Sequence, residues 1–495
     1  MIPPLPERAL RRTTAVAAAV MALALAGCAS IMGADQSRAQ MQNAESLGLS
    51  AQPDASTQAA LPLDSQWWRG FGDAQLDALV DLGLQGNPDL QIARARLARA
   101  QANVDITGAD GKPQVNGAVD LTRQKFPANF IYPPPLGGEV FNVGDALLNF
   151  SWELDFFGKN RTAVEAAVGT QKAAAAEADA ARILLASNIA SAYVQWAYLQ
   201  DRLVVAQRAL EQRQELLKLV QDRVAAGLDT RLQLKQSETS VPTARQQIEA
   251  LNEQIGVAEH ALDALVAKPN ATRGLTPPRL GQLKPMPLQQ TIPADLLGRR
   301  ADIAAARWRA EAANSDVANA KTQFYPDINL AAFAGFNSLG ISDLLQKNSL
   351  EWSVGPAIRL PIFEGGRLRA NLRGKSADLD AAVESYNKTV FDAMRDVADQ
   401  ITAIQSVARQ QVDQHESQEA AEAAYDIGLQ RYRAGLGTFL DVLTAEDTVL
   451  LQRRDGVDLA GRAFQTQVGL ARALGGGWQP EDIATADGAA KTAHN

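Results

Sequence analysis

The chain writes one short sequence twice, 208 residues apart, and this internal duplication limits the folds that are open to it. "RVAAGLDTRLQL" begins at Arg223 and "RYRAGLGTFLDV" begins at Arg431, so Gly-Leu-x-Thr at 227–230 is matched by Gly-Leu-x-Thr at 435–438. A second matched pair begins at Asn87 and Arg300, 213 residues apart, so the two copies slip by only five residues. A register that holds over this distance indicates two halves built on one plan.

Each half contains two segments in which apolar and polar residues alternate. Every even position from 146 to 156 is apolar, while Asn, Ser, Glu and Asp fill odd positions, and a similar pattern runs from 352 to 362. Weaker partners begin at Val115 and Ile328. Alternation with period two predicts strands at about 114–125, 145–157, 326–336 and 350–362.

These predicted strands have the length of tilted transmembrane β-strands, with one apolar face and one polar face. A soluble β-sandwich is the alternative interpretation. Four strands cannot close a membrane barrel, and lipid does not tolerate unpaired strand edges. If the strands cross a membrane, several chains must therefore contribute to one barrel.

Two unusually long stretches without proline follow the strand pairs, from Lys159 to Ala226 and from Gly366 to Ala434. Apolar and aromatic residues recur at every seventh position in both, from Ile189 to Val224 and, with glutamines at 411 and 418, from Val383 to Tyr432. The return segments carry similar seams. This spacing predicts coiled-coil helices at 159–226, 230–268, 366–434 and 438–474. Pro242 is expected to kink the second of these helices, and the three glycines from Gly475 should end the last.

The first thirty residues indicate export and lipidation. Three arginines precede an apolar run from Thr13 to Ala26, which is too short to cross a bilayer and suits a secretory signal. The run ends in "LAGC", and Cys28, the only cysteine, resembles the lipidated residue of bacterial lipoproteins. An ordinary signal peptide with a chance cysteine is the alternative. By resemblance to lipoprotein sorting rules, Ala29 and Ser30 after the cysteine favour the outer membrane.

Composition excludes several function classes. The net charge of -8 and the absence of long basic runs argue against nucleic acid as a partner. Three histidines and one cysteine leave little material for histidine chemistry or a Cys/His metal site. Catalysis by carboxylates alone stays open, but no motif signals it, and we expect no enzyme activity, no cofactor and no metal.

These patterns predict the organisation of the chain. We expect a lipoprotein signal peptide at 1–27, a lipidated tether at 28–63, a first structural repeat at 64–270, a second repeat at 271–475 and a polar C-terminal tail at 476–495. The predicted fold class is mixed α and β, internally duplicated, with two transmembrane β-hairpins and long coiled-coil helices.

Four motifs resemble the TolC-like outer membrane efflux proteins, and more narrowly the NodT-type outer membrane lipoproteins of RND multidrug efflux systems. They are "SQWWRGFGDAQLDALVDLGLQGNPDLQIARARLARA" from Ser65, "SWELDFFGKNR" from Ser151, "PADLLGRRADIAAAR" from Pro293 and "LPIFEGGRLRANL" from Leu360. The resemblance covers roughly 63–475. Ala301 departs from it, because the family's Arg-Arg motif usually continues with proline, which puts the rigid start of the following helix in doubt.

The resemblance implies a homotrimer whose strands form a 12-stranded β-barrel continuous with an α-helical barrel in the periplasm. It also implies two protein partners, a periplasmic adaptor (membrane fusion) protein and an inner-membrane RND transporter. The protein would be lipid-anchored in the outer membrane, with lipid around the barrel, and would extend into the periplasm.

The same resemblance assigns roles to the two turns and to the helix after the second. The adaptor-contact turns would consist of Gly227, Leu228, Thr230, Gly435, Leu436 and Thr438, although plain helix capping explains glycine and threonine there without a partner. Asp441 and Tyr432 match residues that narrow the closed pore. Asp441 could instead be a solvated residue in a first helical turn, and Tyr432 a residue of the helical seam.

The function implied is an exit duct that passes drugs or other small toxic compounds to the outside. An outlet for protein secretion is the alternative within this fold. A coiled-coil scaffold of the envelope without a pore is the alternative from another class, but it leaves the alternating strands unexplained.

Overall fold

The computed structural model describes residues 38–43, 46–47, 63–287 and 296–479. The chain divides into two compact units, and each combines separate stretches of sequence. The first unit takes Leu97–Ala173 and Ala306–Tyr386 together with 38–41, and holds the strands. The second takes 42–96, Ala174–Ala305 and 387–479, and is helical.

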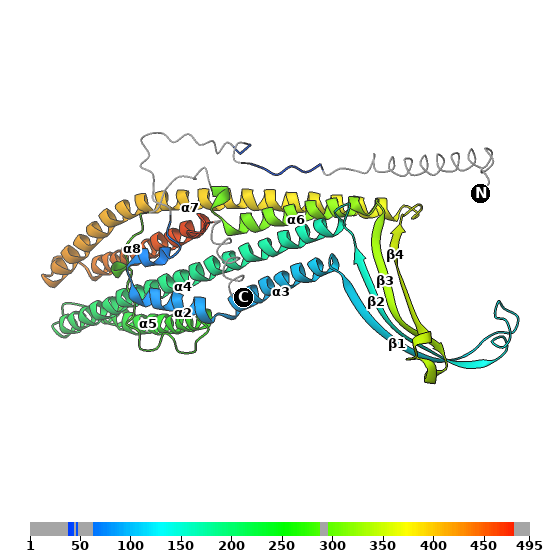
Figure 1. Cartoon of the computed structure of the whole chain (residues 1–495). Coiled ribbons are helices and arrows are strands. Elements are labelled where there is room, and N and C mark those ends of the chain that lie inside the picture. The colour runs from blue at the N-terminus through cyan, green and yellow to red at the C-terminus, as the bar shows by residue number, and fades with distance from the viewer. Residues whose placement is uncertain (1–37, 44–45, 48–62, 288–295, 480–495) are drawn as a thin grey trace. The chain divides into compact units, whose positions relative to one another are not determined.

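The first unit contains a four-stranded antiparallel sheet in the order β1-β2-β3-β4 (Figure 1). β1 spans Gln114–Lys125, β2 spans Val140–Glu153, β3 spans Asp327–Leu339 and β4 spans Leu350–Arg359. Both predicted hairpins are present, and β2 pairs with β3 to join them. β1 and β4 lie at the edges, and each pairs with one strand only within the described part of the chain.

Four of the strand limits differ from the prediction by three residues or more. β2 begins at Val140 rather than 145, because the hairpin ladder continues until Val140 opposes Lys125. It ends at Glu153 rather than 157, where the N–H of Phe156 turns back to the carbonyl of Leu154 (2.9 Å). β4 ends at Arg359 rather than 362, just before Pro361, which has no N–H to donate. β3 continues to Leu339 rather than 336.

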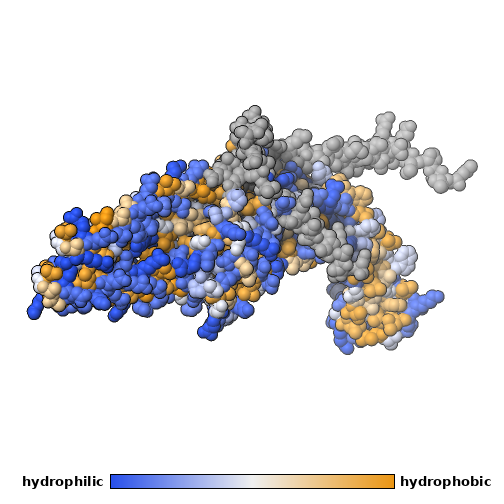
Figure 2. Space-filling view, turned by 90° about the vertical axis from the view of Figure 1, so that its left-hand side faces the viewer, coloured by the Kyte–Doolittle hydropathy of each residue, from blue (hydrophilic) through white to orange (hydrophobic). Residues whose placement is uncertain are grey.

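The pairing register places most of the exposed apolar side chains of the four strands on one face. Val119 opposes Ala146, which opposes Phe336, which in turn opposes Leu350. One residue along, Asp120, Asp145 and Asn337 share the other face. Several side chains of the apolar face are more than half exposed in this chain: Val115, Val119, Leu121, Leu148, Trp352, Val354 and Ile358. Figure 2 shows hydrophobic residues gathered over the strands, whereas the helices present mostly hydrophilic ones.

Four long helices occupy nearly the predicted ranges. They are α4 (Lys159–Ala225), α5 (Arg231–Leu265), α7 (Arg367–Arg433) and α8 (Phe439–Ala473). α5 continues through Pro242 as one helix. Many predicted seam residues are buried: Ile189, Trp196, Val241, Ile255, Leu262, Val383, Val390, Val397, Tyr425, Tyr432, Leu450 and Ala471. Gln411 and Gln418 are not buried, because glutamine in a seam gains nothing from leaving water.

Shorter helices precede each strand pair, and the strand and heptad patterns did not reveal them. α2 (Ala74–Gly86) and α3 (Pro88–Asp110) lead to β1, and α6 (Ala301–Thr322) leads to β3. α6 begins at Ala301 even though the expected proline is missing. The guanidinium of Arg300 bonds the carboxylate of Asp302 (2.7 Å) and the carbonyl of Ala473 (3.0 Å), which fixes the helix start instead.

The main core of the second unit lies around the middle of α4. Trp67, Trp68 and Phe71, in a short 3-10 helix at Trp67–Phe71, pack with α2 against Ile189 and Trp196. The predicted C-terminal tail begins at 476, but Trp478 packs against the second unit: it is 3% exposed and its Nε1 donates to Asp179 (2.9 Å). In the part of the chain that the structure describes, no helix has an apolar stretch long enough to cross a bilayer.

Candidate functional site

The two repeated turns adopt the same backbone conformation. Gly227 and Gly435 both have φ of 75°, the left-handed region that favours glycine. The N–H of Leu228 donates to the carbonyl of Arg223 (2.9 Å), and that of Leu436 donates to Arg431 (2.8 Å). Each glycine therefore ends a long helix and reverses the chain, as in a Schellman motif.

A threonine begins the return helix in each turn. The N–H of Thr230 donates to the side-chain oxygen of Gln233 (2.6 Å). The N–H of Thr438 donates to the carboxylate of Asp441 (2.9 Å), and the N–H of Asp441 donates back to the Thr438 hydroxyl (3.2 Å). Gln233 and Asp441 thus occupy equivalent capping positions in the two halves.

Each turn exposes leucine side chains that do not pack against the rest of the fold. Leu228 is 64% exposed and Leu436 is 70% exposed. One helical turn later, Leu232 and Leu440 are exposed to a similar extent. The repeated Gly-Leu-x-Thr motif contains Leu228 and Leu436 but not Leu232 and Leu440. The second pair could have been found from the sequence, because each lies four residues after the first leucine of its turn and the two occupy equivalent positions in the repeats. The four leucines add apolar surface to each turn, which is unusual for solvated loops.

A buried polar contact links the first turn to the end of α7. The Tyr432 hydroxyl donates to the carboxylate of Asp229, which also pairs with Arg223 (2.9 Å). Arg223 in turn donates to the carbonyl of Tyr432 (3.0 Å) and lies 4.4 Å from the centre of its ring. Tyr432 is 1% exposed. It therefore packs in the helical seam and is also the hydrogen-bond partner of a charged pair.

The ionisation states of Asp229 and Tyr432 strengthen the hydrogen bond between them. Burial would raise the pKa of Asp229, but hydrogen bonds from Arg223 and Tyr432 outweigh it, so the pKa lies below its ordinary value of 3.8. Burial and then the bond to the carboxylate raise the pKa of Tyr432, which keeps its hydroxyl proton as a donor. The contact is thus a neutral phenol bound to an ionised carboxylate, which is a strong type of hydrogen bond.

Asp441 is exposed at the start of α8 and does not reach the Tyr432 group. The backbone N–H of Thr438 lowers the pKa of its carboxyl, so the side chain carries a negative charge. In this chain the side chain caps the start of α8. Because the capping side chain of Asp441 is both ionised and exposed, the turn carries a negative charge at its surface.

A second polar layer lies further along the helices from the turns. Glu446 of α8 is 1% exposed and pairs with Arg213 of α4 (3.3 Å). Arg453 of α8 pairs with Glu422 of α7 and also donates to Gln212 of α4 (2.8 Å). α8 therefore makes charged contacts with both long outgoing helices.

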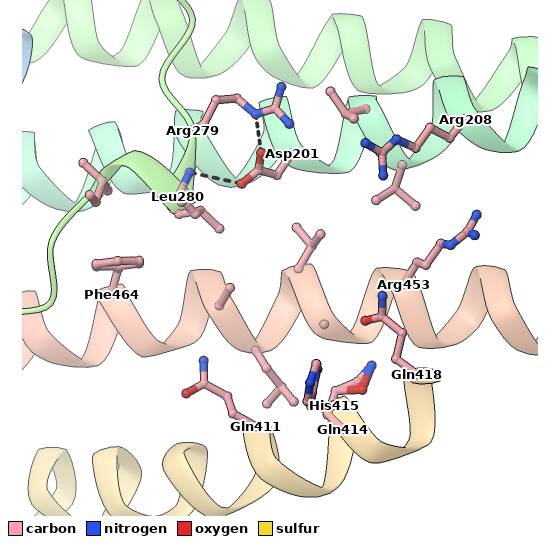
Figure 3. Close-up of a pocket in the computed structure, with 18 of the residues that line it drawn as sticks. Asp201, Arg208, Arg279, Leu280, Gln411, Gln414, His415, Gln418, Arg453 and Phe464 are labelled. Atoms are coloured by element: carbon pink, nitrogen blue, oxygen red, sulfur yellow. Dashed lines mark hydrogen bonds and ion pairs between the residues drawn. The ribbon is translucent and has the colours of Figure 1, made fainter. Parts of the chain in front are cut away.

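A cavity of about 750 Å³ lies in the second unit among α4, α7, α8 and the segment around Leu280 (Figure 3). The carboxylate of Asp201 accepts from Arg279 and from the N–H of Leu280 (3.1 Å). His415 in its wall pairs with Glu419 (3.1 Å).

Sequence reasoning missed Arg223 and Asp229. Both lie in the repeated segment, but Asp229 stands at its variable position, where the second half has Gly437. A partly buried arginine and aspartate six residues apart give no helical pairing signal, because the pair forms across a turn. The predicted lipidation residue, Cys28, lies outside the described residues.

Comparison with known proteins gives consistent matches over nearly the whole chain. A family model described as "Outer membrane efflux protein" matches residues 79–268 and 292–476. The multidrug resistance outer membrane protein MdtQ of Escherichia coli is 32% identical over 478 residues, which cover 94% of this chain and 98% of that protein. The pyoverdine export outer membrane protein OpmQ of Pseudomonas aeruginosa is 31% identical over 422 residues, covering 84% of this chain and 88% of that protein.

Solved structures share the fold. The outer membrane protein VceC of Vibrio cholerae superposes with a TM-score of 0.79 at 35% identity, covering 84% of this chain and 99% of that chain. Each of the two segments matched by the family model contains one strand pair and two of the long helices.

Proposed function

Because the chain belongs to the outer membrane efflux protein family, we propose that it forms a homotrimer that serves as the exit duct of a tripartite pump. The chain itself is an outer membrane efflux channel. In the proposed pump, an inner-membrane RND transporter supplies energy and a periplasmic adaptor joins it to the duct. The cargo is small compounds, which the names of relatives in multidrug resistance and pyoverdine export support.

The sheet is the observation that carries this proposal. It has one exposed apolar face, one polar face, and an open edge at each of β1 and β4. Open edges and an apolar face together are unstable in water and in lipid. Three copies remove both problems when β1 of one protomer pairs with β4 of the next, which gives a barrel of 12 strands with a polar lumen.

The dimensions of the apolar face fit a bilayer. Along β4 and the residue that follows it, the apolar face extends from Leu350 to Leu360, ten residues along the chain. At about 3.3 Å per residue this is roughly 33 Å, and a tilt of about 40° reduces it to roughly 25 Å across the membrane. That is the height of the apolar band on outer-membrane barrels.

We assign the turns to the adaptor and to the gate. The exposed Leu228 and Leu436 give a partner helix an apolar surface, and the rigid turns present it in a fixed orientation. The Arg223, Asp229 and Tyr432 contact holds the two turns of one protomer together and favours the closed state. In a trimer with Asp441 facing the axis, three carboxylates would ring the pore.

We also propose that Cys28 carries the lipid anchor of this outer membrane protein. Incorporation of labelled palmitate into the wild type, and none into Cys28→Ser, is the expected result. Equal labelling of both would rule out Cys28 as the site.

Membrane fractionation and planar-bilayer recording test the duct directly. We expect the protein in the outer membrane fraction, as a trimer, with stable single-channel conductance after reconstitution. A trimer without conductance would favour the envelope scaffold. Conductance together with failure to restore drug efflux in cells, and restored export of a secreted protein, would favour the secretion outlet.

A further inference from the structure

The two most exposed large apolar side chains of the described chain are neighbours in a linker. Ile362 is 88% exposed and Phe363 is 90% exposed. They lie between Arg359, where β4 ends, and Arg367, where α7 begins (Figure 1). Exposing two such side chains to water at one point is costly, which indicates a contact outside this chain.

The linker continues the apolar face of the sheet. Trp352, Val354 and Ile358 lie on that face of β4, and Leu360 follows with the same parity and is 45% exposed. The corresponding linker after β2 also carries exposed aromatic residues. Phe156 is 69% exposed there, and Phe157 stacks on Tyr325 at 5.0 Å. Apolar and aromatic side chains therefore extend past the strand ends, as at the interface of membrane barrels.

Two cations at the start of α7 lack acidic partners. Arg367 pairs with Glu364 (2.9 Å), and Lys375 pairs with Asp316 (3.0 Å). Arg369 and Arg373 are exposed and form no ion pair with any residue that the structure describes. They are four residues apart and so share one face of the helix, while Leu368 and Leu372 are buried on another.

We propose that the linker 360–366 and the first two turns of α7 form a binding site for an anionic phospholipid. Ile362 and Phe363 enter the boundary between acyl chains and headgroups, and Arg369 and Arg373 bind the headgroup phosphate. The inference rests on the proposed function, because it requires that the strands cross the outer membrane. The site then lies at its periplasmic leaflet, since α7 leads from β4 toward the turns.

A phospholipid fits the combination of groups better than the other candidates. A free phosphate would explain the arginines but not the two apolar side chains. A neighbouring copy of this chain would cover the apolar side chains but would leave two like charges to be neutralised. A phospholipid supplies both kinds of group: its acyl chains contact the apolar side chains of the linker, and its phosphate contacts the arginines of the helix.

Native mass spectrometry of the full-length protein in detergent tests the site. Phosphatidylglycerol and phosphatidylethanolamine with identical acyl chains are titrated separately. We expect Arg369→Gln with Arg373→Gln to lower the affinity for phosphatidylglycerol about 30-fold, from about five- to sixfold per basic residue. The loss for phosphatidylethanolamine should be smaller, because its ammonium group offsets the charge of its phosphate. Ile362→Ser with Phe363→Ser should weaken the binding of both lipids.

The matched control removes two other exposed arginines from the same helix, Arg409→Gln with Arg433→Gln, and should bind both lipids like the wild type. Unchanged phosphatidylglycerol binding in Arg369→Gln with Arg373→Gln would overturn the proposal. So would displacement of the lipid by millimolar inorganic phosphate, which would indicate a free-anion site. Efficient cross-linking of Ile362→Cys between protomers would identify a second copy as the occupant.

Planar-bilayer recording of the same wild-type preparation separates this inference from the proposed function. A wild type that conducts while the variants bind lipid normally would refute the lipid site alone. A wild type that forms no channel would refute the function on which the site rests.

Discussion

Tyr432 contributes one hydroxyl to the contact between the turns, and that hydroxyl can be removed without removing the ring. In Tyr432→Phe the ring still lies over Arg223, but Asp229 loses a hydrogen bond. Hydrogen bonds to charged groups contribute about 1.5–3 kcal/mol. We expect the channel to spend roughly tenfold or more additional time in high-conductance states in planar bilayers.

The control for this change is Tyr425→Phe. Tyr425 is buried on the same helix, and its hydroxyl makes no hydrogen bond in the described part of the chain. Tyr425→Phe should therefore show the same gating as the wild type. Equal effects of the two variants would assign the change to packing rather than to the bond with Asp229.

Glu446 predicts a pH dependence of stability. Burial, partly offset by the charge of Arg213, raises the pKa of Glu446 above its ordinary value of 4.5. The folded state therefore holds the proton of Glu446 more tightly than the unfolded chain does. Protonated Glu446 adds to the free energy of unfolding in full below about pH 4.5, and this stabilisation is lost as the pH rises through the folded-state pKa. Glu446→Gln cannot ionise, so its Tm should fall less than that of the wild type over this window.

The exposed Glu419 provides the comparison for thermal unfolding in detergent. Glu419→Gln should keep the wild-type dependence of Tm on pH. If Glu446→Gln keeps it as well, then another group titrates in this range.

Glycines in different elements have the same backbone angle for different reasons. Gly227 has φ of 75° and open space around it, while Gly477 has φ of 76° and packs against the backbone of Asp64. Gly227→Ala should cost about 1–2 kcal/mol, the ordinary cost of a left-handed alanine. Gly477→Ala adds overlap of its Cβ with the carbonyl of Asp64, so the second unit should unfold at a clearly lower denaturant concentration. Equal midpoints for both variants would show that the segment around Asp64 moves aside freely.

The turns can also be tested as binding elements. Leu228→Asp with Leu436→Asp places charge on exposed surface, so trimer yield and Tm should stay unchanged while cross-linking to the adaptor falls to background. Leu451→Asp changes an exposed leucine of α8 outside the turns and should cross-link normally. Normal cross-linking of the double variant would show that the repeated motif only caps helices and does not bind the adaptor.

The elements show what the sequence can and cannot reveal. Heptads and alternation are one-dimensional signals of burial, so α4, α7 and the strands follow from them within a few residues. In α3 and α6 apolar and polar residues are poorly separated onto different faces, so no periodic pattern in the sequence predicted these helices. The Asp229 contact depends on how α7 ends beside another turn, and no local pattern contains that information.

At the scale of the whole molecule, the proposed trimer makes ion selectivity depend on which residues face its axis. Threefold symmetry repeats each such residue, so one carboxylate per chain becomes a ring that attracts cations and impedes anions. Asp441 both caps α8 and carries a charge, and alanine would remove both properties. Asp441→Asn removes the charge and leaves an acceptor for the N–H of Thr438, so it tests the ring with less disturbance of the helix.

If Asp441 faces the axis, Asp441→Asn should lower the cation preference of the channel, measured as the reversal potential across a salt gradient in a planar bilayer. Gln233→Glu supplies the reciprocal change, because Gln233 holds the equivalent capping position in the first half. Under the same pseudo-symmetry, the added carboxylate should raise the cation preference, since six charges would then surround the axis instead of three. Unchanged reversal potentials in both variants would place these capping residues on the outside of the tube. The constriction would then belong to residues nearer the buried Tyr432 contact.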